Sequence, residues 1–133
     1  MKAKLIAVVL AAGVLLAAKT TVAHHAFSAE FDANKPITLT GTVTKLEWTN
    51  PHAWFYMDVK DASGKVTNWA FEMGAPNGLI REGWTRNSMK IGETVTVAGS
   101  RAKDGSAIAN AQTVTLKSTG QRLFAASSRG QKE

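Results

Sequence analysis

The stretch ITLTGTVTKLEW, residues 37 to 48, begins with alternating side chains and then loses the alternation. One face carries the apolar or small residues Ile37, Leu39, Gly41 and Val43, while threonines occupy the other. Leu46 and Trp48 then fall on the opposite parity. A change of phase inside one strand is produced by a β-bulge or a tight bend, and a glycine eases sharp curvature. We therefore predict a strand over 37–48 with a bulge or bend within residues 43 to 46.

Four further segments have the period of strands, which predicts five strands in total. They are AWFYMDVK (53–60), VTNWAFEM (66–73), TVTVAGSRAK (94–103) and AIANAQTVTL (107–116). A short helix is expected over Gly78 to Glu82, ended by Gly83. Five antiparallel strands with a bent first strand and a helix between the third and fourth are typical of a small OB-like barrel. An open sandwich or a lipocalin-like half barrel is the alternative.

The inward parities of these strands predict the hydrophobic core. Trp69 and Phe71 are expected to be buried. Their predicted neighbours are Phe55, Met57, Val95 and Val97. We further expect Leu79, Ile80 and Trp84 to cover one end of the sheet.

The N-terminus has the features of a secretory signal. Lys2 and Lys4 precede an apolar run of fourteen residues, Leu5 to Ala18, which is shorter than the roughly 20 residues a membrane-spanning helix needs. Thr21-Val22-Ala23 places small residues at the two positions that a signal peptidase reads, which predicts cleavage after Ala23. We predict a domain over 24–116 and a flexible tail over 117–133, with docking of Leu123 and Phe124 on the barrel as the alternative for the tail. The cleaved protein is then expected to be periplasmic or secreted, without a membrane anchor. An uncleaved anchor is the alternative.

Composition excludes several classes of function. The chain has no Cys, which excludes disulfides, lipid attachment at Cys and thiolate metal sites. Removing the three signal-region lysines takes the net charge from +6 to +3, and basic and acidic residues are interspersed, so we do not expect nucleic-acid binding. No nucleophile elbow or His-paired hydroxyl motif is present, and we do not expect an enzyme.

Four segments together resemble a known family. They are HHAFSAEFD (24–32), WTNPHAW (48–54), REGWTRNSMKIGETVTV (81–97) and RAKDGS (101–106). The chain is similar to a family of small exported bacterial proteins that is known only as a domain of unknown function, and the similarity runs from His24 to Leu116. This resemblance implies an exported OB-like β-barrel and supplies no substrate or catalytic residue.

The histidines suggest a metal site. After cleavage behind Ala23, His24 has a free α-amino group beside its imidazole, and His25 follows directly. With His52 in the loop between the first two strands, these nitrogens suit a copper or zinc ion. The hypothesis requires the segment from Phe27 to Phe31 to pack against the barrel. The alternative is an unstructured N-terminus and a His52 that only forms hydrogen bonds in its turn.

Aromatic residues beside His52 suggest a second kind of site. Trp54 and Tyr56 have the outward parity of their strand, and with Trp48 and His52 they are candidates to line a small-ligand site. The N-terminal arm or the tail covering these rings is the alternative. The sequence thus predicts an exported binding module for a metal ion or small ligand, or else a ligand-free accessory that docks on another envelope protein through its aromatic face.

Overall fold

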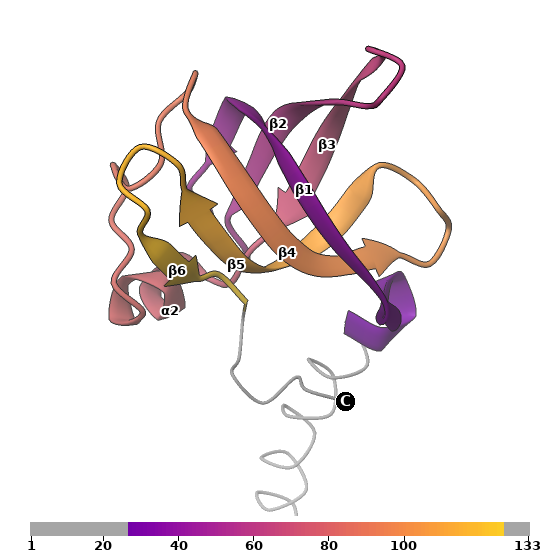
Figure 1. Cartoon of the computed structure of the whole chain (residues 1–133). Coiled ribbons are helices and arrows are strands. Elements are labelled where there is room, and N and C mark those ends of the chain that lie inside the picture. The colour runs from indigo at the N-terminus through magenta and orange to yellow at the C-terminus, as the bar shows by residue number, and fades with distance from the viewer. Residues whose placement is uncertain (1–26, 127–133) are drawn as a thin grey trace, which may run out of the picture. The chain divides into compact units, whose positions relative to one another are not determined.

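The computed structural model describes residues 27 to 126, and the chain divides into two compact units, Met1–Glu30 and Phe31–Glu133. In the first unit, residues 27 to 30 are helical. No helix within residues 27 to 126 is long and apolar enough to cross a membrane. The second unit is mostly β (Figure 1). Its elements are β1 (Phe31–Glu47), β2 (Trp54–Lys60), β3 (Val66–Glu72), α2 (Pro76–Arg81), β4 (Thr94–Ala102), β5 (Ile108–Leu116) and β6 (Arg122–Phe124).

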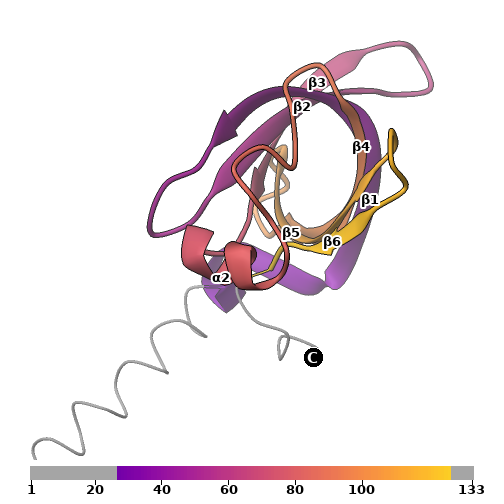
Figure 2. The same cartoon turned by 90° about the vertical axis from the view of Figure 1, so that its left-hand side faces the viewer.

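The strands form one sheet in the order β3-β2-β1-β4-β5-β6, in which all neighbours are antiparallel. In addition, β3 pairs in parallel with β5 over Ala70–Glu72 and Ile108–Asn110. These pairings close β1, β2, β3, β5 and β4 into what we call the strand ring, and the strands curve around a shared interior (Figure 2). The predicted mostly-β, antiparallel class is confirmed, with a sixth strand in addition.

β1 pairs with two neighbouring strands. It pairs with β4 from Pro36 to Thr42 and with β2 from Thr42 to Glu47. The register shifts between Val43 and Lys45, which confirms the predicted bulge. β1 is longer than predicted, because its pairing with β4 continues past a second irregularity to Phe31.

The core contains the predicted residues. Phe55, Met57, Phe71 and Val95 are fully buried, and Val97 and Trp69 nearly so. Phe55 and Phe71 stack with ring centroids 4.9 Å apart. Leu79 and Trp84 are buried as expected, but Ile80 is 55% exposed, so its predicted role in covering the sheet is wrong. A helix as short as α2 turns one side chain inward while its sequence neighbour faces solvent.

The C-terminal segment differs from the predicted tail over residues 117 to 126. Gln121 O accepts a hydrogen bond from Leu116 N at 2.9 Å, and β6 then pairs with Thr113–Thr115 of β5. Leu123 and Ala125 are buried, and the Trp84 indole donates to Phe124 O at 2.9 Å. This segment therefore completes the core beside α2. Residues 127 to 133 lie outside the described part of the chain.

We predict that Phe71→Ala lowers the free energy of unfolding by about 3–5 kcal/mol, because it leaves a cavity beside Phe55. Ile91→Ala, at a side chain 70% exposed, serves as the control and should change stability by less than about 0.5 kcal/mol. Denaturant unfolding of both variants checks this. A loss below about 1 kcal/mol for Phe71→Ala would contradict the assigned inner face of β3.

A second stability prediction concerns Gly99, where the β4–β5 register shifts. A Cβ there would overlap the backbone carbonyl of Asn110, so Gly99→Ala should cost about 1–3 kcal/mol through overpacking. The matched control is Gly78→Ala in α2, whose Cβ would meet nothing within 4 Å, and which should gain roughly 0.5–1 kcal/mol of stability. Equal thermal melting of the two variants would refute the close approach at Gly99.

Candidate functional site

The outward side of β1, β2 and β3 carries the aromatic residues singled out in the sequence. Phe55 and Met57 point into the core, so Trp54 and Tyr56 project to the other side of β2. Register places Tyr56 between Lys45 and Ala70, and Trp54 between Glu47 and Glu72. We call Lys45, Glu47, Trp54, Tyr56 and Glu72 the outer aromatic face.

Three of these side chains form one charged cluster. Lys45 Nζ lies 2.7 Å from Glu47 Oε1 and 5.2 Å from the centroid of the Tyr56 ring. The Tyr56 hydroxyl donates to Glu47 Oε2 at 3.3 Å. The hydrogen bond from Lys45 lowers the pKa of Glu47, and its reciprocal raises the pKa of Lys45. Burial, followed by the negative charge of Glu47, raises the pKa of Tyr56.

Next to this cluster, towards the β2–β3 turn, Thr44, Asp58 and Asn68 form a row of hydrogen-bonded polar side chains. Asn68 Nδ2 donates to Thr44 Oγ1 at 3.0 Å and to Asp58 Oδ1 at 2.8 Å. Thr44 is the residue that the register shift in β1 leaves without a partner in β2. The row fixes the amide of Asn68 and ties the side chains of β1, β2 and β3 together.

His52 is held above Glu72 by the backbone of the β1–β2 loop. Hydrogen bonds from Ala53 N to Gly74 O (3.0 Å) and from Met73 N to Ala53 O (2.8 Å) fasten the end of this loop to the end of β3. His52 Nδ1 then lies 2.9 Å from Met73 O and 3.1 Å from Glu72 Oε1. A carbonyl oxygen can only accept, so Nδ1 carries the proton. In the neutral imidazole, Nε2 is then the atom with a lone pair to offer.

The structure brings together three of the four predicted ligand-site residues. His52, Trp54 and Tyr56 share the outer aromatic face or its border, whereas Trp48 is half-buried and packs against the core. Sequence reasoning missed Lys45 and Glu47 as parts of this surface. The change of phase after Val43 was the sequence signal for both residues. A bulge at this point moves Leu46 to the inner side of β1 and Lys45 and Glu47 to the outer side.

The predicted three-histidine metal site includes residues outside the described part of the chain. His24 and His25 lie outside residues 27 to 126, and within that range no group of three or more His, Asp or Glu is placed to hold a metal ion. Phe31 is buried, but as the first residue of β1 and not as part of a helical turn. Within residues 27 to 126, His52 is the one histidine, and Glu72 is the carboxylate that lies against its Nδ1.

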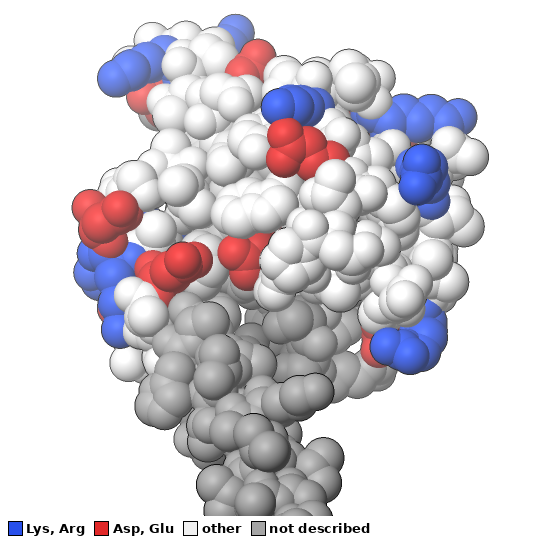
Figure 3. Space-filling view, turned by 180° about the vertical axis from the view of Figure 1, so that it is seen from behind, with Lys and Arg blue, Asp and Glu red and all other residues white. Residues whose placement is uncertain are grey.

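Charged groups are spread over the face of the molecule that Figure 3 shows. Seen from behind, Lys, Arg, Asp and Glu occur in scattered groups among uncharged residues, without one continuous basic stripe on that side (Figure 3). A binding surface on this side would therefore act through local contacts and not through a long-range field.

The fold and this surface define a small, mostly β protein with a cluster of aromatic rings, carboxylates and one histidine on the outside of its sheet. Residues 11 to 111 match the model of a family of unknown function, DUF6152, and the chain belongs to that family. This confirms the resemblance to an uncharacterised domain. No curated protein matches the chain.

Tyr56 is the only tyrosine, so absorbance at alkaline pH reports on it alone. We predict that Glu47→Gln lowers the pKa of Tyr56, because the charge and the hydrogen-bond acceptor that favour the neutral phenol are removed or weakened. Lys45→Met should raise it, because the neighbouring cation favours the phenolate. Because the pKa of Tyr56 is raised in the folded protein, its neutral phenol contributes to stability below the unfolded pKa. This contribution is lost as the pH rises through the folded pKa.

The control for this titration is Asp61→Asn, in the exposed β2–β3 turn, which should leave the pKa of Tyr56 unchanged. Shifts of the same sign in Glu47→Gln and Lys45→Met would contradict the cluster geometry.

Proposed function

We propose that this protein is an exported, periplasmic binding module that holds a metal ion such as copper or zinc, or a small ligand, at His52 and the outer aromatic face. In this proposal the mature chain begins at His24. The circuit β1-β2-β3-β5-β4 and the position of α2 between β3 and β4 support an OB-like barrel as its scaffold.

One observation carries the proposal, namely the orientation of His52. Histidines that bind metals donate their second ring N–H to a carboxylate or a backbone carbonyl, which fixes the tautomer and the direction of the other nitrogen. His52 Nδ1 has both kinds of partner, Glu72 and Met73 O. The His52 side chain is 35% exposed, so a ligand can reach the imidazole. His24 and His25 stay sequence-based predictions for further ligands.

The neighbouring rings support the small-ligand form of the proposal. Trp54 and Tyr56 are half-buried, which offers ring surface to stack on at little cost in side-chain freedom. Glu47 and Glu72 flank Trp54 across the sheet. A planar or cationic group seated on Trp54 would thus meet carboxylates on both sides.

A second candidate function rests on the same rings. Partly exposed Trp and Tyr are enriched at protein–protein interfaces, so the outer aromatic face also suits a ligand-free accessory that docks on another envelope protein. Trp54→Ala separates docking from the metal form of the proposal, because it removes a docking ring and leaves the His52–Glu72 pair in place.

The test is calorimetric titration of Cu(II) and Zn(II) into mature protein whose intact mass confirms His24 as its first residue. We expect His52→Ala to weaken binding at least tenfold, and Glu72→Gln to weaken it by about 10- to 100-fold through loss of the supporting carboxylate. Asp61→Asn is the matched control and should bind as the wild type does. Retained affinity in a His24→Ala, His52→Ala double variant would count against the metal form of the proposal.

A further inference from the structure

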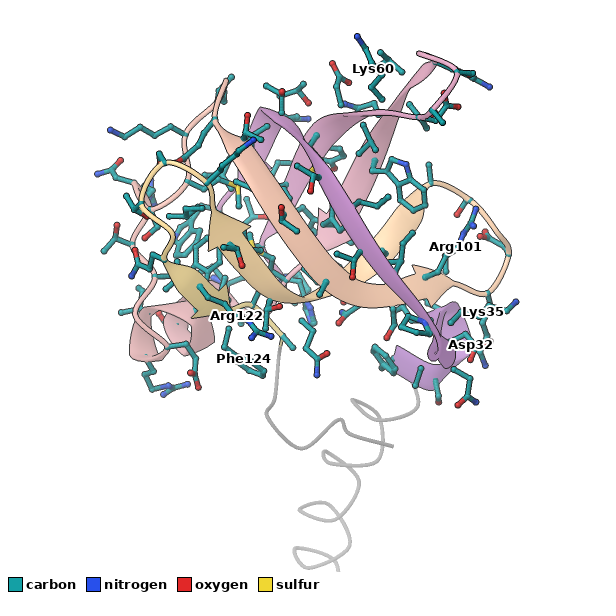
Figure 4. The ribbon with its side chains drawn as sticks, in the orientation of Figure 1. Asp32, Lys35, Lys60, Arg101, Arg122 and Phe124 are labelled. Atoms are coloured by element: carbon teal, nitrogen blue, oxygen red, sulfur yellow. The ribbon has the colours of Figure 1, made fainter. Side chains whose placement is uncertain are left out.

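Arg101 lies on the inner side of β4, at one end of the strand ring. It shares the parity of the buried Val95 and Val97, and its partner in β5 is the fully buried Ala109. Its guanidinium carbon is 5.4 Å from the centroid of the Trp69 ring, which also belongs to the core. Figure 4 shows Arg101 beside the turn between β4 and β5, far from Arg122 and Phe124 on β6.

The guanidinium ends a column of stacked aromatic rings. Phe55 stacks on Phe71 with centroids 4.9 Å apart, and Phe71 on Trp69 at 6.2 Å. Arg101 Nη2 donates to Gly105 O at 2.9 Å. The ring face and this carbonyl together fix the plane of the guanidinium before any ligand arrives.

Arg101 has no carboxylate within ion-pair distance among residues 27 to 126. Its Nε is buried and has no hydrogen-bond partner there, an arrangement that costs free energy and is uncommon in folded proteins. Asp104, the nearest acidic residue in sequence, accepts instead from Ser106 N at 2.9 Å and from Ser106 Oγ at 2.6 Å. The hydroxyl hydrogen bond is the main cause of the lowered pKa of Asp104.

The surroundings of this cation on the inner side are apolar. Ile37 of β1 pairs with Gly99, which lies two residues before Arg101 in β4. Val59 lies two residues after Met57, and Met57 is the partner of Trp69 in β2. Partly buried hydrophobic residues at this end pack against the core, and we call them the apolar rim: Ile37, Leu39, Val59 and Ala107. The rim thus combines accessible apolar surface with one unsatisfied charged donor, the combination found in small-molecule sites.

We propose that Arg101 and the apolar rim bind a small amphipathic carboxylate, such as a medium-chain fatty acid. The Nη N–H groups that do not bind Gly105 O can donate to one carboxylate. The buried Nε–H becomes available to the same ligand when the side chain rotates. The apolar chain of the ligand then covers the rim. This site is separate from the outer aromatic face, because Arg101 and Trp69 face the interior while Trp54 and Glu72 face outward.

The test is calorimetric titration of the mature protein with octanoate below its micelle concentration, with acetate and 1-octanol as probes of the charge and the chain alone. We expect octanoate to bind at least about tenfold more tightly than either probe, and Arg101→Gln to weaken octanoate binding about tenfold or more. Lys103→Gln removes an exposed cation from the same turn and should leave octanoate affinity unchanged.

A second measurement needs no substitution and covers the case in which Arg101→Gln fails to fold. The ¹⁵N resonances of Arg101 Nε–H and the Trp69 indole should shift when octanoate is added to the wild-type protein. The proposal is overturned by a wild type that does not bind octanoate, by shifts confined to other residues, or by equal losses in Arg101→Gln and Lys103→Gln. Metal titrations at His52 are independent of all these outcomes.

Discussion

Closure of the sheet depends on β1, which pairs with β4 on one side and with β2 on the other. β1 gives its first half to β4 and its second half to β2, and Thr42 is the residue that pairs with both, through Thr94 and Asp58. Just before it, a side chain at Gly41 would run into the carbonyl oxygen of Asp58. A glycine is therefore needed where β1 passes from one partner to the other, because the backbone of β2 lies too close to Gly41 to leave room for a Cβ.

The bulge that follows decides which chemistry faces outward. With regular alternation from the buried Val43, Lys45 and Glu47 would point into the core. The register shift instead pairs Lys45 with Tyr56 and Leu46 with the buried Phe55. One extra residue in β1 thus places an apolar side chain inside and an ion pair beside Tyr56 outside. The bulge in β1 therefore determines both the inner packing of this strand and the composition of the outer aromatic face.

Local period was enough to predict the bulge, the core faces of β2 and β3, and the outward parity of Trp54 and Tyr56. Contacts between distant segments were not predictable in this way. β6 has only three residues and no period of its own, and its place depends on Trp84 and on β5. The partnership of His52 with Glu72 likewise depends on the closing of the β1–β2 loop onto the end of β3. His24 and His25 lie outside the described residues.

β3 contributes to both proposed sites through opposite faces. Glu72 projects outward beneath His52, while Trp69, three positions earlier, projects inward under Arg101. The outward side offers carboxylates and an imidazole and thus favours cations, whereas the inward side offers a guanidinium and favours anions. Both depend on the register of β3, which β2 fixes along the strand and β5 fixes at its end. A change in that register would remove both sites together, so loss of one alone identifies a change of side-chain chemistry and not of fold.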